Sequence, residues 1–221
     1  MERGHPCPHE RAARKGIMSN QQDDYKPVGW HSRGYLPHFD AGDVFQSITF
    51  RLHDSMPQTL LEKWRRELAR EDDFEDRLRY RIEAYLDRGY GACYLSNERI
   101  ANLTQSALLH FDGERYRLSA WVVMPNHVHL LAAPCFGYSL SSIMHSLKSF
   151  TSLEANKVLG RKGKFWFEDY FDRYIRNAKH FENAIAYIED NPVRAGLCQF
   201  ADDWPFGSAW FKSRAARAAQ A

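Results

Sequence analysis

The strongest constraint on the fold comes from two apolar runs, residues 116–124 and about 126–133, which are joined through Met124-Pro125-Asn126. The first run contains the aromatic and β-branched residues Tyr116, Trp121, Val122 and Val123, which favour a strand over a helix. Because the connection is so short, the two strands are expected to pair as in a hairpin. The chain is therefore predicted to contain an antiparallel sheet built around this strand pair.

The segments before this pair predict one strand and three helices. Residues 44–52 are rich in β-branched and aromatic residues and indicate a first strand. Between residues 58 and 89 the apolar positions recur at helical spacing, with a second helix starting near Phe74 after an acidic cluster. Residues 96–108 indicate another helix, which ends near Asp112-Gly113.

The segments after the pair predict a long helix, a short strand and a last helix. The long helix spans residues 139–159, and Gly160 is placed to end it. Its inner face is expected to carry four apolar side chains: Ile143, Leu147, Phe150 and Val158. A short strand is expected over 173–176 and a helix over 179–190, which Pro192 stops. This order of elements predicts an α+β fold, a ferredoxin-like sandwich of an antiparallel sheet with helices packed on it.

Length and composition indicate one folded domain with two tails. Of the 221 residues, 44% are hydrophobic, enough for one ordinary core. Residues 1–42 lack periodicity and are interpreted as a flexible or loosely packed arm, residues 43–210 as the catalytic domain and residues 211–221 as a basic tail. The formal net charge of +2 is too small to identify a nucleic-acid-binding protein by charge alone.

The cysteines and the apolar runs favour a cytoplasmic protein. The four cysteines are widely separated and form no Cys-x-x-Cys pair, which suggests neither a disulfide framework nor a ribbon-type zinc site. No run approaches the roughly 18 apolar residues that a membrane span requires. We therefore expect a reducing cytoplasm and no membrane insertion.

The second strand of the pair carries a candidate metal site. The strand period of two sends His127 and His129 to one face and Val128 into the core. Side chains in that relation are about 6.6 Å apart along the strand, so two imidazoles could converge on one ion. Two histidines leave coordination positions for a phosphate and water, as phosphoryl transfer requires. The alternative is that one histidine caps a turn while the other is exposed on the sheet.

The last predicted helix carries a candidate nucleophile. Helical spacing places Tyr187 and Asn191 about 6 Å apart on one face, so the carboxamide oxygen could become a third metal ligand beside the tyrosine hydroxyl. A free tyrosine is phenolate in only about one molecule in a thousand at neutral pH, so a nucleophilic role requires a nearby cation or base. The alternative is a core aromatic whose hydroxyl is hydrogen-bonded.

Three motifs in this order resemble the REP-associated tyrosine transposases, members of the His-hydrophobe-His superfamily of single-strand endonucleases. The motifs are residues 121–131, residues 165–176 with Phe165-Trp166 and Asp172-Arg173-Tyr174-Ile175-Arg176, and residues 187–197 with Tyr187-Ile188, Asn191-Pro192-Val193 and Ala195-Gly196-Leu197. The similarity extends from about Val44 to Trp204-Pro205.

The resemblance implies both the site and the reaction. His127 and His129 would bind Mg²⁺ or Mn²⁺, Asn191 would complete the site, and Tyr187 would be the nucleophile. Attack by Tyr187 on single-stranded DNA would give a 5′-phosphotyrosine link and a free 3′-hydroxyl, and a different 3′-hydroxyl could reverse the step and join strands. The expected partners are single-stranded DNA and hairpins formed by palindromic repeats.

Basic residues around both motifs could contact the DNA. Residues 141–180 contain eight basic side chains against four acidic ones. Six are candidate phosphate contacts: Lys148, Arg161, Lys162, Lys164, Arg173 and Arg176. The cluster Phe165-Trp166-Phe167 could stack on bases, although burial of at least two of these rings is expected.

Two other functions compete with the transposase. A protein of this fold that has lost its chemistry could still bind repeat DNA, although His127, His129, Tyr187 and Asn191 are all present. A zinc hydrolase could use the histidine pair, but no third histidine or cysteine stands at conventional spacing. The sequence leaves open whether the protein is a monomer or a homodimer.

Overall fold

A computed structural model describes residues 29–32, 37–40 and 42–219, and the fold below refers to these residues. The main sheet has four antiparallel strands in the order β4-β5-β3-β6. Its strands are β3 (Gln46–Arg51), β4 (Tyr116–Val123), β5 (His127–Pro134) and β6 (Phe171–Tyr174). A second, two-stranded sheet pairs β1 (Gly29–Ser32) with β2 (Pro37–Asp40), inside the segment interpreted as an arm.

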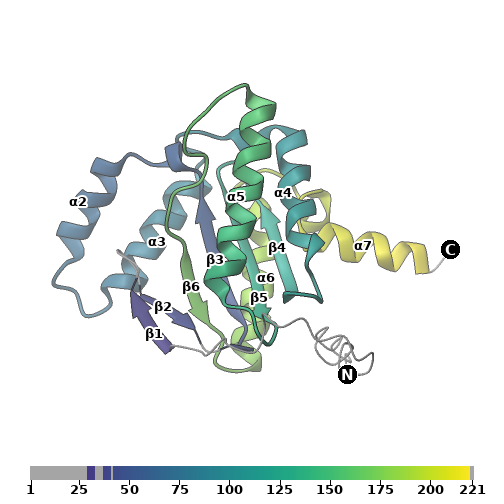
Figure 1. The fold of residues 1–221 in the computed structure, drawn as a ribbon, viewed down its shortest axis with the longest axis horizontal. Coiled ribbons are helices and arrows are strands. Elements are labelled where there is room, and N and C mark those ends of the chain that lie inside the picture. The colour runs from purple at the N-terminus through teal and green to yellow at the C-terminus, as the bar shows by residue number, and fades with distance from the viewer. Residues whose placement is uncertain (1–28, 33–36, 41, 220–221) are drawn as a thin grey trace.

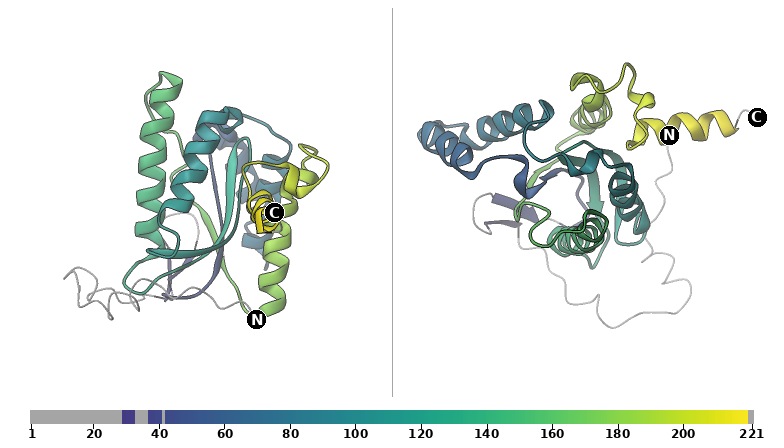
Figure 2. Two further views of the ribbon diagram at one scale, coloured as in Figure 1. Left: turned by 90° about the vertical axis from the view of Figure 1, so that its right-hand side faces the viewer. Right: turned by 90° about the horizontal axis from the view of Figure 1, so that it is seen from above.

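Six α-helices of the described chain surround the main sheet (Figure 1). They are α2 (Gln58–Leu68), α3 (Phe74–Asp87), α4 (Glu98–His110), α5 (Leu140–Leu159), α6 (Ala178–Arg194) and α7 (Ser208–Ala219). Helices α4 and α5 cover one face of the sheet, and α6 covers the other, with α3 beside it (Figure 2). The predicted α+β fold, an antiparallel sheet with helices packed on it, is confirmed.

Strand alternation divides the core between the two faces. On β5, Val128 and Leu130 are buried in the cluster that also contains residues of α4 and α5, as expected for Val128. Leu131, one position later, packs instead with residues of α6 such as Ile188. His127 and His129 share the face of Leu131, so the histidine pair lies on the side of the sheet that α3 and α6 cover.

Two details of the predicted helices are wrong. Phe150 is 51% exposed, whereas Thr151 is fully buried and accepts a hydrogen bond from Trp166 Nε1 at 2.8 Å. The inward positions of α5 follow Leu147 with a spacing of four, which selects Thr151 and turns Phe150 outward.

Pro192 does not stop the last predicted helix but lies inside α6, which continues to Arg194. In the final turn a proline removes only its own N–H from the hydrogen-bond ladder. The carbonyls of Asn191 and Pro192 still accept hydrogen bonds, from Ala195 N at 3.0 Å and Leu197 N at 2.8 Å. Asn191 is therefore helical and keeps its place one turn after Tyr187.

Three further observations bear on the sequence-based expectations. Helix α7 begins at Ser208 and runs through most of the predicted basic tail. Cys135 is disulfide-bonded, which the wide spacing of the cysteines did not predict. Among the described helices, none combines the length and the apolar character that crossing a bilayer requires.

Candidate metal and tyrosine site

The histidine pair lies in the interior of the sheet. His127 and His129 are buried, at 0% and 1% exposure, and pair across the ladder with Arg51 and Thr49 of β3. Their Nε2 atoms face each other at 2.9 Å. The alternative in which one imidazole is exposed on the sheet is wrong.

The hydrogen bonds of Asn126 determine which nitrogen of His127 carries a proton. The Asn126 amide group donates to the carbonyls of Leu86 at 3.0 Å and Tyr90 at 3.1 Å. Its Oδ1 is therefore free to accept, and it lies 2.7 Å from Nδ1 of His127. Nδ1 must hold the proton of the neutral ring, which leaves a lone pair on Nε2.

Thr49 has the same effect on His129. The Thr49 hydroxyl donates to Oε1 of Glu83 at 3.5 Å and lies 2.7 Å from Nδ1 of His129. A hydroxyl that donates to a carboxylate accepts from the ring, so Nδ1 of His129 carries the proton and Nε2 has a lone pair.

Both rings are neutral at physiological pH. Burial, reinforced by the charges of Arg194 and Arg79, lowers the pKa of His129 to about 3. Burial and the adjacent His129 lower the pKa of His127 well below its ordinary value. Two nitrogen lone pairs therefore face each other in the protein interior, an arrangement that a cation between them would stabilise.

A carboxylate completes a three-residue group that could hold a metal ion. Asp87, at the end of α3, has a ligand atom within 4.8 Å of those of His127 and His129. Its Oδ1 lies 3.6 Å from Nε2 of His127 and is buried without a hydrogen-bond partner. Burial raises the pKa of Asp87 to about 6, and Arg194 opposes this shift, so the side chain is largely ionised at pH 7.

The geometry fits a divalent ion. Two nitrogens at about 2.1 Å from one octahedral ion, in neighbouring positions, are about 3.0 Å apart. The 2.9 Å between the two Nε2 atoms is close to this separation. Two imidazoles and a carboxylate oxygen could hold a divalent ion and leave coordination positions for water and phosphate oxygens.

Asn191, the third ligand that the resemblance implied, is fully buried on α6. Neither its Oδ1 nor its Nδ2 has a hydrogen-bond partner in the described structure. A buried carboxamide without a partner costs free energy, roughly 1–3 kcal/mol, unless another group satisfies it. Asn191 is thus a further candidate ligand, in addition to Asp87.

Tyr187 reaches the histidine pair from α6. Its ring centroid lies 5.6 Å from that of His129, with an interplanar angle of 80°. The hydroxyl does not point to solvent but donates to Oε2 of Glu83 at 3.0 Å. Burial and the negative charges of Glu83 and Asp87 raise the pKa of Tyr187 above its ordinary value, although Arg194 opposes this. The tyrosine is therefore neutral in the structure and needs a proton acceptor or a cation to act as a nucleophile.

The exposed Arg194 lies at the edge of this site. Its guanidinium carbon is 4.9 Å from the centroid of the Tyr187 ring. Tyr187, Asn191 and Arg194 follow each other at spacings of four and three along α6, so they share one helix face. Arg194 is a positively charged residue on that face and could meet a phosphate.

The six basic residues predicted to contact DNA do not form a single patch. Lys148 and Lys164 line a cleft of about 750 Å³ beside α5, whereas Arg173 and Arg176 line a separate cleft of about 320 Å³ beside the start of α3. The Lys148 ammonium donates to the carbonyl of Glu168 at 2.8 Å, and burial lowers its pKa to about 8.

Arg161 and Lys162, the other two predicted DNA contacts, differ in how accessible their side chains are to a phosphate. Arg161 donates to the carbonyl of Lys164 at 3.1 Å, whereas Lys162 is exposed. Of the aromatic cluster, Phe165 and Trp166 are buried, as expected, so they are unavailable for stacking.

Glu83 and Asp87 are candidate site residues that the sequence did not reveal. They stand four residues apart on α3, which places both carboxylates on the helix face that meets β3, β5 and α6. The spacing is visible in the sequence, but neighbouring acids such as Asp76 are exposed, and no local signal separates the two kinds.

Part of the chain, which includes the candidate site, is similar to a known protein family. The sequence profile of the family described as "Transposase IS200 like" matches residues 92–191, a segment that contains both histidines, Tyr187 and Asn191. Over these residues the chain is similar to the IS200-like transposases, and the resemblance deduced from the motifs is confirmed.

The chain is also similar to the REP-associated tyrosine transposase of Escherichia coli (strain K12), with 30% identity over 94 residues. The aligned part is 42% of this chain and 54% of the relative, so the chain spans about half the length of that relative. A solved structure described as a REP-associated tyrosine transposase bound to a REP hairpin has a TM-score of 0.49 and 20% identity, and covers 85% of this chain and 86% of its own.

Proposed function

We propose that this protein is a metal-dependent endonuclease and strand transferase for single-stranded DNA that uses Tyr187 as its nucleophile. The observation that carries the proposal is the position of the Tyr187 ring, 5.6 Å from the His129 ring, beside two imidazole nitrogens that face each other with lone pairs. A phenol beside a cation site is what phosphodiester attack by tyrosine requires.

His127, His129 and Asp87 would hold Mg²⁺ or Mn²⁺, and Asn191 would add a carboxamide oxygen. The bound ion would polarise a phosphoryl oxygen and offset charge that develops on the phosphate. The protein itself orients the imidazole ligands. Asn126 and Thr49 fix the two imidazole rings through their Nδ1 atoms, which keeps both Nε2 atoms directed at the same point.

The Tyr187 oxygen would attack the phosphorus and displace the 3′ oxygen of the neighbouring nucleotide. The products are a 5′-phosphotyrosine and a free 3′-hydroxyl. Because one phosphoester replaces another, a second 3′-hydroxyl can reverse the step and join strands without ATP. Arg194 is placed to contact the phosphate, since it lies at the exposed end of the helix face that carries Tyr187.

The proposed substrate is single-stranded DNA that can form hairpins at palindromic repeats. The E. coli relative is described as REP-associated, and the solved structure is described as bound to a REP hairpin. Lys162, Lys164, Arg173 and Arg176 are proposed phosphate contacts, since they lie at or near the surface. We assign Lys148 and Arg161 a smaller part because their side chains already donate to backbone carbonyls.

The test is adduct formation with labelled DNA. A single-stranded repeat hairpin labelled at its 3′ end should, with Mn²⁺, give a protein–DNA adduct that survives denaturant, because the 3′ portion of the DNA stays on the tyrosine. The same hairpin labelled at its 5′ end should release a shorter fragment with a free 3′-hydroxyl. Tyr187→Phe should abolish both products while the protein still binds Mn²⁺.

Two controls separate the alternatives. Tyr174→Phe removes a hydroxyl on β6 and should leave adduct formation intact. If the wild-type protein binds the hairpin but forms no adduct under any metal condition, the protein is a repeat-DNA-binding factor and the proposed function is wrong.

A hydrolase in which the same three residues hold zinc is the second candidate. Two histidines and one carboxylate form the protein part of known catalytic zinc sites. Hydrolysis would cut the hairpin with no covalent intermediate, and Tyr187→Phe would leave the cleavage rate nearly unchanged.

A further inference from the structure

The Tyr187 hydroxyl donates a hydrogen bond to Glu83, a residue that lies outside all three sequence motifs. We propose, on the basis of the proposed function, that Glu83 is the general base that takes the proton of Tyr187 during attack on the phosphodiester. The proposal rests on the 3.0 Å contact from the Tyr187 hydroxyl to Oε2 of Glu83. That distance is within the range that direct proton transfer requires.

Glu83 is held in place from both sides. Its Oε2 accepts from Tyr187 on α6, and its Oε1 accepts from the Thr49 hydroxyl on β3 at 3.5 Å. Thr49 also contacts Nδ1 of His129. One continuous chain of hydrogen bonds therefore links the nucleophile, the carboxylate and the metal-site imidazole, so Glu83 can respond to charge at the site.

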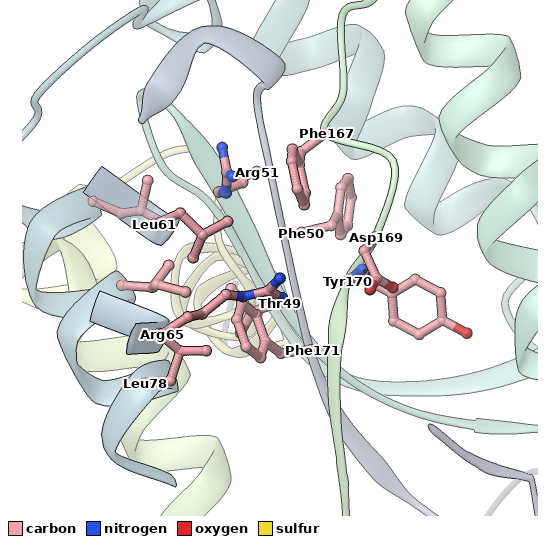
Figure 3. A pocket seen from close by; sticks show the side chains of 12 residues that line it. Thr49, Phe50, Arg51, Leu61, Arg65, Leu78, Phe167, Asp169, Tyr170 and Phe171 are labelled. Atoms are coloured by element: carbon pink, nitrogen blue, oxygen red, sulfur yellow. Dashed lines mark hydrogen bonds between the residues drawn. The ribbon is translucent and has the colours of Figure 1, made fainter. Parts of the chain in front are cut away.

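The surroundings of Thr49 keep bulk water away from that side. The cavity between α2, α3 and β3 has a volume of only about 20 Å³, room for about one water molecule (Figure 3). Most of its wall is apolar, with Leu61, Leu78 and Phe171 among its lining residues. The cavity therefore has room for about one water molecule beside Thr49, the residue that holds Oε1 of Glu83.

Burial and the nearby charges together make the Glu83 carboxylate a stronger base than an exposed one. Burial raises its pKa above the ordinary value, and Arg79, one turn earlier on α3, partly offsets this rise. Asp87, one turn later, adds negative charge and raises it further. From α6, Tyr187 donates its hydrogen bond, and Arg194 lies beyond the tyrosine ring. A carboxylate whose pKa is raised accepts a phenol proton more readily than an exposed carboxylate does.

The step balances with water as the proton donor to the leaving group. The O–H bond of Tyr187 breaks, its proton moves to Oε2 of Glu83, and the phenol oxygen forms a bond to phosphorus. The bond from phosphorus to the 3′ oxygen breaks, and that oxygen takes a proton from a water molecule, which leaves hydroxide in the solvent. In the joining reaction, the incoming 3′-hydroxyl gives its proton to hydroxide, and Glu83 returns its proton to the departing tyrosine oxygen.

The test measures the single-turnover rate of adduct formation in Mn²⁺. Glu83→Gln preserves the size of the side chain and should lower the rate constant by about 10²- to 10⁴-fold, the usual contribution of a general base. The rate in this variant should rise tenfold per pH unit over pH 6–9, whereas the wild-type rate should level off. Glu75→Gln is the matched control, because Glu75 lies exposed on the same helix, and it should leave the rate unchanged.

A fluorinated tyrosine at position 187 distinguishes catalysis from a structural role. Its phenol is a stronger acid and depends less on a base, so it should recover a large part of the rate lost in Glu83→Gln. A misfolded site would not recover in this way. Mn²⁺ affinity of the Glu83→Gln protein should stay within about twofold of wild type.

The results test the role of Glu83 separately from the proposed function. If Glu83→Gln keeps the wild-type rate and pH profile, or loses activity that the fluorinated tyrosine does not restore, Glu83 is not the base. The proposed function still stands in that case if the wild-type adduct forms. If the wild-type protein forms no adduct, the proposed function fails and the role of Glu83 fails with it.

Discussion

The Nε2 atom of His127 lies 2.9 Å from the Nε2 atom of His129, and the hydrogen bonds at the far side of each ring leave a lone pair on both atoms. Asn126 and Thr49 together impose this arrangement, because each requires a proton on Nδ1. Two facing lone pairs repel unless a cation lies between them. The geometry of the strand pair therefore favours a metal ion bound between the two Nε2 atoms.

Metal binding should depend on this pair and on Asp87. In Mn²⁺ at about 100 times its dissociation constant, the wild-type protein should gain about 2.7 kcal/mol of stability. His129→Ala and Asp87→Asn should each lose most of that gain, because each removes one ligand of the three-residue group. The measurement is urea unfolding with and without Mn²⁺. His145→Ala, which removes an exposed histidine of α5, should behave as wild type.

The role of Asn191 can be separated from that of Asp87. If its carboxamide oxygen is a ligand, Asn191→Ala should weaken Mn²⁺ binding by about tenfold, the lower end of what loss of a coordinating contact costs. Calorimetric titration of both variants checks this. An Asn191→Ala protein with wild-type affinity would remove Asn191 from the ligand set and leave Asp87.

His38 on β2 should make stability depend on pH in the alkaline range. Burial opposes its charge, but hydrogen bonds to Asp169 and Asp172 prevail and raise the pKa of His38 to about 9. A group whose pKa is higher in the folded state stabilises the protein below its unfolded pKa of about 6.5 and loses this effect as the pH rises through 9. The loss should be up to about 3 kcal/mol.

Urea unfolding at pH 6.5 and pH 9.5 measures this effect. His38→Gln should be less stable than wild type at pH 6.5 and should lose little more at pH 9.5. An equal loss in both proteins would show that the contact between His38 and the two aspartates does not titrate in this range.

Gly91 should be intolerant of a side chain. It has a φ of +76°, and a Cβ there would collide with the backbone carbonyl of Ser55. Gly91→Ala should cost roughly 1–3 kcal/mol more than Gly89→Ala, whose Cβ would meet no atom within 4 Å at a similar φ of +70°. Because Asn126 donates to the adjacent Tyr90 carbonyl, Gly91→Ala should also weaken Mn²⁺ binding. Equal stability of the two variants would contradict the steric argument.

The sequence predicts those parts of the site that depend on local periodicity. The strand period of two put His127 and His129 on one face, and helical spacing put Tyr187 and Asn191 one turn apart. Both relations follow from backbone geometry and need no knowledge of the tertiary fold. The strand pair and the helices over 58–89 and 139–159 were predictable for the same reason.

Glu83 and Asp87 were not predictable because their roles depend on where α3 packs. The helix carries several acids, and only packing against β3, β5 and α6 determines that Glu83 and Asp87 face inward while Asp76 stays in solvent. Phe150 was misplaced for a related reason. The apolar pattern of a helix locates its buried face only to within about one residue. In α5 the buried position is Thr151, which accepts a hydrogen bond from Trp166, and the neighbouring Phe150 is turned outward.

The most direct test of the central claim is to identify the residue that carries the DNA. The adduct formed with a single-stranded repeat hairpin and Mn²⁺ is digested with protease and nuclease, and the peptides are sequenced by mass spectrometry. We predict a nucleotide joined through a 5′-phosphate to the peptide that contains Tyr187. A nucleotide on the peptide of Tyr170 or Tyr174 instead would contradict the account.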